Sequence, residues 1–372
     1  MNISIIIPTW NREDLVEDLL ASLEKARAAY RYGDSEVIVV DSSEGAAREA
    51  IMKSCTDHDA RYYYGDNSVR KKRNLGIDRA SYEVIHFIDS DVTVCEDILN
   101  IHAETFLNDD DPMLGGSFGL TEFVGPKNFW WKIVEHTTYL DSFRFAKMFP
   151  YQSWTIGNNV AFKKDVLLEI GKFQEDFHFK LGGDDLEMTY RITKAGYRIK
   201  SAPDAVAYHS TETWSHASAI HNRTKRWGHM EYYIRQAHPE LFVNCIPKSD
   251  VLFGVFLILC AVLSLIRLTP APLFLWCGWL VLYVIVGYLI ECGKQVRNPF
   301  YYLAGKWIHK RYHWYFIKES ISHKDFSCLH KEMSFSVYQS LHMYKEETAK
   351  LWVFLCTFFV SLPVWAIIMG GL

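Results

Sequence analysis

The sequence places two carboxylates directly after a short apolar run. The run Val84–Ile88 has the length and composition of a buried strand, and Asp89-Ser90-Asp91 follows it at once. Open α/β sheets bind their ligands at the carboxyl edge of the parallel strands, so this triplet predicts a ligand site. Carboxylate oxygens suit a hard divalent cation, and such a cation suits a diphosphate. For the triplet alone, a solvated acidic turn is the alternative.

The first 245 residues alternate between strand-like and helix-like segments. Strands are expected at Ile3–Ile7, Glu36–Val40, Arg61–Tyr64 and Val84–Ile88, and helices at Arg12–Tyr30, Glu44–Ser54 and Ser68–Ala80. This alternation predicts an α/β domain with a mixed, mainly parallel sheet under covering helices. Because parallel strands end at one edge, the polar clusters that follow them should meet in one crevice.

Two further groups of residues belong to this predicted crevice. Asp41, at a strand end, could hydrogen-bond a base or a ribose, or else act as a helix N-cap. The helix from Ser68 brings the basic run Arg70–Arg73 to the same edge, where cations would balance a diphosphate. A solvated basic face is the expectation for at least two of these four residues.

A glycine pair leads into two adjacent carboxylates later in the chain. Gly182-Gly183 precede Asp184-Asp185 at the start of an expected helix. One carboxylate can cap the helix while the other projects into a pocket, where it could accept a proton from an acceptor hydroxyl. The pair could also serve only to orient the helix.

The composition changes near Asp250. Beyond it, apolar runs cover Val251–Ile266, Leu273–Ile290 and Leu351–Leu372. A helix needs roughly 20 apolar residues to cross the hydrocarbon core of a bilayer, with a lower limit near 17. The runs therefore predict three transmembrane helices, with a buried core hairpin as the alternative.

The segment between the second and third runs is rich in Lys, Arg and aromatic residues. Lys and Arg favour the cytoplasmic side, and basic and aromatic side chains together suit helices at the headgroup level. An ordinary cytoplasmic subdomain is the alternative. We expect a multi-pass protein of the cell (inner) membrane. Its predicted regions are a cytoplasmic α/β domain at 1–245, a transmembrane hairpin at 246–292, interfacial helices at 293–348 and a third transmembrane helix at 349–372.

Net charge, the N-terminal residues and the cysteines exclude several classes of protein. The net charge of −4 comes without a pervasive basic stripe, so nucleic acid is not an expected partner. Met1 leads directly into a strand-like run, and we expect no signal peptide. The eight cysteines form no CxxC pair, which favours buried free thiols over a zinc site or a disulfide scaffold.

Seven segments of residues 1–227 together resemble one enzyme family. In order, they are "IIIPTWNR", "VVDSS", "RNLGIDRA", "FIDSDV", "GNNVAFKKDVLLEIGKFQEDF", "GGDDLEMTYRITKAGYRI" and "AVAYH". They resemble the family 2 glycosyltransferases with the GT-A fold, a nucleotide-sugar domain. The resemblance implies a nucleotide-sugar donor, a Mg²⁺ or Mn²⁺ ion and inversion at the anomeric carbon.

The resemblance also implies roles for residues on the donor side. Thr9 and Asp41 would touch the nucleoside, with Arg73 close by, and Asp89 would hold the ribose or uracil side. Asp91 would bind the metal that bridges the diphosphate. The remaining residues expected to bind the donor or line its sugar are Pro8, Asn11, Arg12, Gly157, Asn158 and Asn159.

The catalytic base and a further metal contact follow from the same resemblance. Asp185 falls where the family keeps its base, and Asp184 stands where glutamate is commoner, so either could be the base. His209 matches a position that can supply a metal or phosphate contact, with a structural histidine as the alternative. A base is needed for a hydroxyl acceptor but not for a polyprenyl phosphate, which favours transfer onto a sugar hydroxyl.

A later motif bears on the acceptor. Processive synthases of this family carry Gln-x-x-Arg-Trp, and this chain has Arg226-Trp227 but Arg223 in place of the glutamine. Trp227 is either an acceptor platform or a packed aromatic residue. The sequence thus predicts an inverting, membrane-anchored glycosyltransferase that extends a lipid-linked saccharide or polysaccharide precursor. A polyprenyl-phosphate glycosyltransferase and a non-catalytic membrane scaffold are the alternatives, and the oligomeric state stays open.

Overall fold

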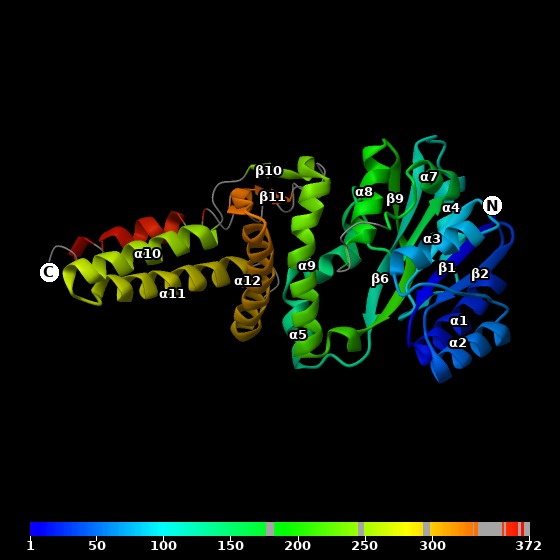
Figure 1. Cartoon of the computed structure of the whole chain (residues 1–372), viewed down its shortest axis with the longest axis horizontal. Helices are drawn as coiled ribbons and strands as arrows, with labels where there is room; N and C mark the ends of the chain where they lie inside the picture. Colours follow the sequence, from blue (N-terminus) through cyan, green and yellow to red (C-terminus); the bar gives the residue numbers. More distant parts are fainter. Residues whose placement is uncertain are drawn as a thin grey trace. The chain divides into compact units, whose positions relative to one another are not determined.

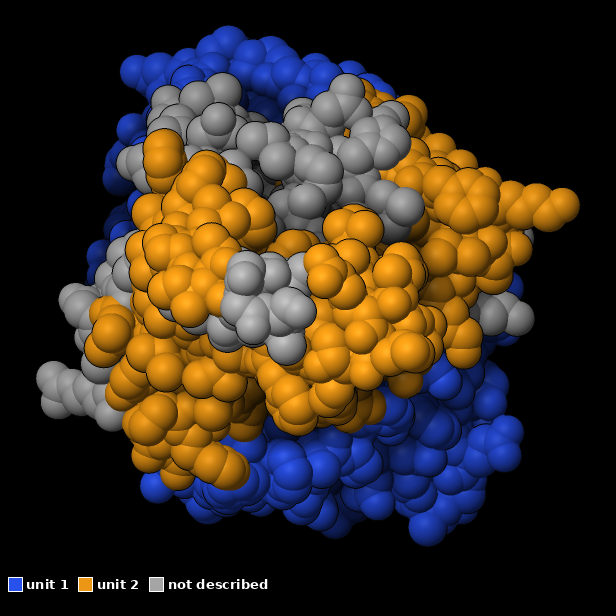
Figure 2. All heavy atoms as spheres, turned by 90° about the vertical axis from the view of Figure 1, so that its left-hand side faces the viewer, with its two compact units in different colours: residues 1–234 blue, residues 235–372 orange. Residues whose placement is uncertain are grey.

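The chain forms two compact units in a computed structural model. The units comprise Met1–Ile234 and Arg235–Leu372, coloured blue and orange in Figure 2. The division falls inside a helix, eleven residues before the boundary expected at 245. The structure describes residues 1–175, 182–244, 249–292, 298–329 and 331–333, and near the C-terminus 352, 355–363 and 366–367.

A nine-stranded sheet forms the centre of the first unit (Figure 1). Its order is β3-β2-β1-β4-β8-β6-β9-β5, and β7 pairs with β9. The strands are β1 (Ile3–Thr9), β2 (Ser35–Asp41), β3 (Arg61–Tyr64), β4 (Val84–Ile88), β5 (Val92–Val94), β6 (Leu114–Val124), β7 (Tyr151–Gln152), β8 (Asn159–Lys163) and β9 (Arg198–Ser210).

The sheet is mixed, as predicted. The parallel pairs are β1 with β2, β1 with β4, β2 with β3, and β6 with β9. The antiparallel pairs are β4 with β8, β6 with β8, β5 with β9, and β7 with β9. Six of the nine strands therefore run in one direction and β5, β7 and β8 run in the opposite one, which agrees with the prediction of a mixed, mainly parallel sheet.

Helices cover both faces of this sheet. They are α1 (Glu13–Ala28), α2 (Gly45–Asp57), α3 (Val69–Arg79), α4 (Ile98–Leu107), α5 (Phe129–Glu135), α6 (Phe145–Met148), α7 (Lys164–Glu169), α8 (Asp184–Lys194) and α9 (Ala217–Ala237), with 3₁₀ turns η1 (Thr138–Arg144), η2 (Thr211–Trp214) and η3 (Pro239–Leu241). The predicted helices over Arg12–Tyr30, Glu44–Ser54 and Ser68–Ala80 correspond to α1, α2 and α3.

Alternating side chains of β1 enter the cores on the two faces. Ile3, Ile5 and Ile7 pack with apolar residues of α1, α2 and α4. Ile6 packs on the other face, with apolar residues of α3, α7 and α8. Helix α3 lies so close that a Cβ on Gly76 would stand 2.4 Å from Cγ2 of Ile6. This two-sided burial explains the continuous apolar run of the strand and brings the start of α3 to the carboxyl edge of the sheet.

The second unit is helical apart from one small sheet. Its elements are α10 (Ser249–Arg267), α11 (Ala271–Cys292), α12 (Pro299–Ser322), η4 (Phe326–Leu329), and the antiparallel strands β10 (Phe242–Asn244) and β11 (Lys331–Met333). Helices α10 and α11 lie side by side (Figure 1), and Trp279 of α11 is buried against Phe256 and Phe358.

Among the residues described, none of the helices combines the length and the apolar character that crossing a membrane requires. The three spans stay a prediction. Much of the third run, including 353–354, 364–365 and 368–372, lies outside the described residues, as does most of the segment 334–351.

Candidate active site

A pocket opens at the carboxyl edge of the parallel strands. Thr9 ends β1 and is paired in register with Asp41, which ends β2. The pocket has a volume of about 530 Å³ and is lined by Trp10, Asn11, Ser42, Glu44, Tyr64, Gly65, Asp66 and Asn67. The aromatic residues Trp10 and Tyr64 are half exposed, and the sequence interpretation did not include them. The sequence marks them only by position: Trp10 directly follows β1, and Tyr64 is the last residue of β3.

Asp41 supports the floor of this pocket and is fully buried. One carboxylate oxygen accepts hydrogen bonds from the backbone and hydroxyl of Ser43, at 2.9 and 2.6 Å, and the other accepts from the Tyr62 hydroxyl at 3.0 Å. Burial, together with Asp41, raises the pKa of Tyr62 to about 12. Asp41 is not the helix cap either, since Glu44 precedes α2. Its oxygens bind protein groups, which differs from the direct nucleoside contact predicted.

The other residues predicted for the nucleoside lie close by in different settings. Asn11 lines the pocket, and its backbone donates to Ser43 Oγ at 2.7 Å. Pro8 is buried within β1. Thr9 is also buried, and within the part of the chain that the structure describes its hydroxyl has no hydrogen-bond partner. Thr9 therefore offers a polar atom for a ligand in the crevice.

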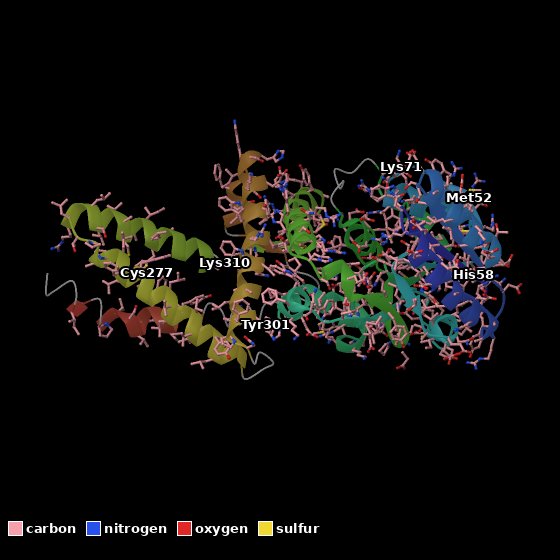
Figure 3. The ribbon with its side chains drawn as sticks, turned by 90° about the horizontal axis from the view of Figure 1, so that it is seen from below. Met52, His58, Lys71, Cys277, Tyr301 and Lys310 are labelled. Atoms are coloured by element: carbon pink, nitrogen blue, oxygen red, sulfur yellow. The ribbon has the colours of Figure 1, made fainter. Side chains whose placement is uncertain are left out.

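The basic run of α3 is buried, contrary to the expectation of a largely solvated face. Arg70, Lys72 and Arg73 are buried, and only Lys71 reaches the surface (Figure 3), where it pairs with Asp66. Lys72 donates to the Thr9 carbonyl at 2.6 Å and to Ser42 Oγ at 2.9 Å. Burial lowers the pKa of Lys72 to about 8, although Asp41 opposes the change. These three side chains are buried because α3 packs closely on β1.

The acidic triplet is brought together with three of the residues predicted to accompany it. Asp91 lies 2.9 Å from Arg12 Nη1 and 3.6 Å from His209 Nε2. Asp89 lies 2.9 Å from Arg73 Nη2. Burial raises the pKa of Asp89, and Asp91 adds to the increase while Arg73 opposes it. Two carboxylates and an imidazole thus share one small, polar region at the end of β4.

Arg73 connects this acidic region to the glycine-hinged carboxylates. Its Nη1 donates to Asp184 at 2.8 Å, and its Nη2 donates to Asp89 and to the Gly157 carbonyl. Burial alone would lower the pKa of Arg73, but Asp89, Asp184 and Asp185 raise it overall. A Cβ on Gly157 would stand 2.6 Å from Nη2, so a larger residue here would displace the guanidinium. The arginine is thus a shared counter-ion for both parts of the site.

Asp185 occupies a different environment from its neighbour. Gly182 and Gly183 both have positive φ values, 104° and 82°, and Gly183 takes the N-cap position of α8, so neither aspartate caps the helix as expected. Asp185 accepts from the backbone of Leu186 at 2.9 Å and of Gly157 at 3.1 Å. Burial, followed by the charge of Asp184, raises the pKa of Asp185 to about 6. Such a carboxylate is a stronger base than an ordinary one.

The side chains of the two asparagines after Gly157 bind other protein groups, whereas the prediction was that they line the sugar. Asn159 is fully buried, and its Oδ1 lies 3.0 Å from His86 Nε2 and 3.1 Å from His102 Nε2. Its amide donates to two carbonyls of β6 and β9. Asn158 exchanges hydrogen bonds with Thr121. Because β8 lies inside the sheet, these amides join neighbouring strands.

The residues predicted for the acceptor lie on α9. The Trp227 ring packs against Trp214 and Tyr139, with ring centroids 5.7 and 5.6 Å apart. Arg226 is exposed to solvent. The structure therefore places Trp227 in an aromatic cluster, which accords with either of the roles considered for it.

The described residues contain no group of three or more His, Cys, Asp or Glu side chains arranged to hold a metal ion. Asp91 and His209 nevertheless converge on one point, with Asp89 nearby. Carboxylate oxygens and an imidazole nitrogen form a donor set that suits Mg²⁺ or Mn²⁺.

Comparison with known proteins identifies the family. A family model described as "Glycosyltransferase like family 2" matches residues 1–229. The chain belongs to this family. Its α/β domain with a mixed sheet has a GT-A-like fold, as the sequence motifs predicted.

Curated relatives match the same part of the chain. Chondroitin synthase of Pasteurella multocida (strain Pm70) is 29% identical over 252 residues, covering 56% of this chain and 25% of that protein. Poly-beta-1,6-N-acetyl-D-glucosamine synthase of Staphylococcus aureus (strain MSSA476) is 25% identical over 214 residues, covering 55% of this chain and 49% of that protein. The matches thus span between a quarter and a half of these relatives.

A solved structure of a mannosyltransferase from Pyrobaculum calidifontis, in complex with GDP-Man and Mn²⁺, is similar over 97% of this chain and 86% of that one. The TM-score is 0.46, at 16% identity.

Proposed function

We propose that this protein transfers a sugar from a nucleoside-diphosphate donor to a hydroxyl of a glycan or lipid-linked saccharide, with inversion. One observation carries the proposal. Arg73 holds Asp89, in the acidic triplet that follows β4, and Asp184, the neighbour of Asp185. The donor and acceptor ends of a transfer reaction would thus meet at one cation. Family membership supports glycosyl transfer, and the relatives' names support polysaccharide synthesis.

The donor's nucleoside fits the pocket at the strand ends. Trp10 and Tyr64 offer aromatic surface to a base, and Thr9 offers its hydroxyl. The pocket adjoins Ser42, whose hydroxyl Lys72 holds in place. We propose a UDP-sugar as the donor, with the diphosphate directed toward Asp89 and Asp91.

Asp91, His209 and Asp89 would hold a Mg²⁺ or Mn²⁺ ion at the diphosphate. When bound, the ion would act as a Lewis acid that stabilises negative charge on the leaving phosphate. In the structure Arg12 pairs with Asp91 at 2.9 Å, so Arg12 would have to release this carboxylate. Its guanidinium would then lie beside the phosphates and could donate hydrogen bonds to them.

Asp185 would act as the general base. It accepts the proton of the acceptor hydroxyl while that oxygen forms a bond to the anomeric carbon. The bond from this carbon to the diphosphate oxygen breaks, and its electron pair leaves with the nucleoside diphosphate. Because the acceptor attacks opposite the leaving group, this single displacement inverts the configuration. Asp184 holds Arg73 and so fixes the base relative to the donor.

The acidic pair also bears on the class of acceptor. A polyprenyl phosphate carries negative charge and has no proton that must be removed. Asp184 and Asp185 would repel such an acceptor, whereas a hydroxyl gains from a base with a pKa of about 6. This charge arrangement supports a sugar hydroxyl over a polyprenyl phosphate.

The second unit supports attachment to the cytoplasmic face of a cell membrane. On α10 and α11, Ile258, Leu265 and Phe274 expose 65%, 75% and 71% of their surface. Contiguous exposed apolar surface marks membrane or protein contacts. Trp307 and Trp314, which are exposed and seven residues apart on α12, suit the headgroup level. We therefore propose a membrane-anchored enzyme whose first unit works in the cytoplasm.

Donor turnover tests this function. The full chain in detergent micelles would be given a panel of UDP- and GDP-sugars, with Mn²⁺ or with EDTA, and nucleoside diphosphate release would be measured. We expect release from one donor to depend on Mn²⁺, with a matching sugar added to a membrane-extracted saccharide by mass spectrometry. Release from none of the donors, or full release in EDTA, would contradict the proposal.

The orientation needs a separate experiment, because Cys328 is buried and unsuited to labelling. A single cysteine at the exposed position of Lys318, in a variant whose eight native cysteines are all replaced by serine, should react only from the cytoplasmic side. Labelling of intact cells from outside would reverse the proposed topology.

A further inference from the structure

Arg73 is held by hydrogen bonds at its two Nη atoms. Nη1 donates to Asp184, and Nη2 donates to Asp89 and to the Gly157 carbonyl. Within the part of the chain that the structure describes, the buried Nε has no hydrogen-bond partner. Hydrogen bonds at the two Nη atoms fix one edge of the guanidinium and restrict its tilt about that edge only weakly. The orientation of the guanidinium plane therefore depends on the groups that pack against it.

The ring of Phe173 packs against this guanidinium. Arg73 Cζ lies over the ring, 5.3 Å from its centroid, which is within the range of a cation–π contact. Phe173 is buried, and its ring also meets the Phe87 ring edge to face, with the two centroids 5.5 Å apart. Phe87 belongs to β4, the strand that leads directly into Asp89. The Phe173 ring thus contacts both the cation and the strand that carries one of its acidic partners.

Asn74, the residue after Arg73 on α3, fixes the backbone of Phe173. Asn74 Nδ2 donates to the Phe173 carbonyl at 2.8 Å, and the Phe173 amide donates to Asn74 Oδ1 at 3.0 Å. Both residues are buried, and hydrogen bonds are stronger in such surroundings than in water. Two consecutive residues of α3 therefore hold the ring and the cation that the ring contacts.

The turn that carries Phe173 is also attached to α3 and α8 by other side chains. Lys172 has a φ of 58°, a conformation that residues other than glycine rarely adopt. Arg191 of α8 donates to the Lys172 carbonyl at 2.6 Å, and Lys172 Nζ donates to Asp78 of α3 at 2.7 Å. The position of Phe173 is thus fixed by the same two helices that supply the cation and the pair of aspartates.

We propose that Phe173 is a positioning residue that orients the guanidinium of Arg73 and so aligns the base Asp185 with the donor. This inference rests on the proposed glycosyl transfer and adds to it a residue that acts through Arg73. A tilted guanidinium would keep its charge but would no longer hold Asp89 and Asp184 in one arrangement. Transfer rates are sensitive to such changes, because a misplacement of about 1 Å can cost roughly a hundredfold in rate.

Kinetics and binding of the variant Phe173→Leu provide the test. The full chain in detergent micelles, with Mn²⁺ and the donor that the wild type uses, gives kcat from nucleoside diphosphate release. Titration gives the affinity for the same nucleoside diphosphate. We expect kcat to fall about tenfold to hundredfold, because the alignment is lost. The affinity should stay within about twofold of the wild type, because Phe173 does not line the pocket at the strand ends.

Three further variants separate positioning from stability. Phe106→Leu, in α4, removes a ring of similar burial, 6% exposed against 3%, and should lose stability without losing kcat. In an Arg73→Lys background, Phe173→Leu should lower kcat less than about threefold, because the point charge of lysine has no plane to orient. Phe173→Met leaves less empty space and replaces the leucine variant if that one does not fold.

Several results would overturn the inference alone. They are an unchanged kcat in a folded Phe173 variant, a parallel loss of kcat and nucleotide affinity, an equal loss of kcat in Phe106→Leu, or an undiminished effect in the Arg73→Lys background. If the wild type releases no nucleoside diphosphate from any donor, the proposed function fails instead. A crystal structure of Phe173→Leu then decides the positioning role. Arg73 in unchanged contact with Asp89 and Asp184 would overturn it, and a guanidinium turned away from either would support it.

Discussion

The two units of this protein place their apolar side chains in opposite environments. In Met1–Ile234, the side chains of Ile3, Ile5 and Ile7 are fully buried between sheet and helices. In Arg235–Leu372, Ile258 and Leu265 expose 65% and 75% of their surface. The first unit is folded by burial of apolar surface away from water. The second exposes large apolar side chains, which are unfavourable in water.

Buried arginines sharpen the same comparison. Arg73, in the first unit, is shared among Asp89, Asp184 and the Gly157 carbonyl at the candidate active site. Arg235, in the second, pairs with Asp325 and approaches Ser320, joining the end of α9 to α12 and the loop after it. Burying a charged side chain is costly in both units. In the first unit the buried arginine joins residues of the candidate active site, and in the second it joins helices.

The largest expected effect separates the two aspartates of the hinge. Asp185→Asn should reduce transfer about 100- to 10,000-fold, because general base catalysis is lost, while donor affinity measured by titration stays close to the wild type. The matched variant Asp184→Asn keeps the base and loses the Arg73 ion pair, so its loss should be smaller. An inactive Asp184→Asn beside an active Asp185→Asn would exchange the roles of the two residues.

The next effect concerns the acidic triplet. Asp91→Asn should abolish the stimulation by Mn²⁺ of nucleoside diphosphate binding, because it removes a charged ligand at the site shared with His209. Titration with and without Mn²⁺ measures this directly. Asp110→Asn removes an exposed carboxylate of the same unit and serves as the control. Undiminished stimulation in Asp91→Asn would place the ion elsewhere.

One pair of substitutions tests the contrast between the units themselves. Ile5→Ala should destabilise the first unit by about 2–5 kcal/mol, since it opens a cavity in a packed core. Leu265→Ala, at a side chain that is 75% exposed, should change the unfolding free energy by less than about 0.5 kcal/mol. Thermal unfolding of the full chain in detergent, followed by circular dichroism, compares the two. Equal losses would mean that Leu265 is covered in the folded protein.

The smallest effect is a shift in pH dependence. The pKa of Asp185 is raised to about 6, and the ionised form is the base. The kcat should therefore be level above this pH and fall as pH drops through about 6, approaching tenfold per pH unit. In Asp184→Asn the neighbouring negative charge is gone, so the inflection should move to lower pH. A pH profile of kcat for the two proteins provides the measurement. An inflection that rises, or one present in donor binding alone, would contradict this assignment.

Much of the N-terminal part of the first unit, from β1 to β4, could be predicted from the sequence. The strands β1 to β4 and helices α1 to α3 are local, and their hydrophobic periodicity marks them. Because those strands are parallel, their ends had to meet, which brought Asp89 and Asp91 into one crevice with the end of β1. The antiparallel entry of β8 left no comparable pattern, so Asn159 was assigned to the sugar when it joins His86 and His102 in the core.

The sequence by itself determined which residues stand at strand ends and where the apolar and charged segments lie, because these depend on periodicity over a few residues. Only the tertiary structure decided which charges meet. Arg73 lies 16 residues from Asp89 and 111 from Asp184, and Lys72 lies 63 residues from Thr9. Partners so far apart along the chain are selected by how α3 and α8 pack on the sheet, and packing is a property of the whole domain.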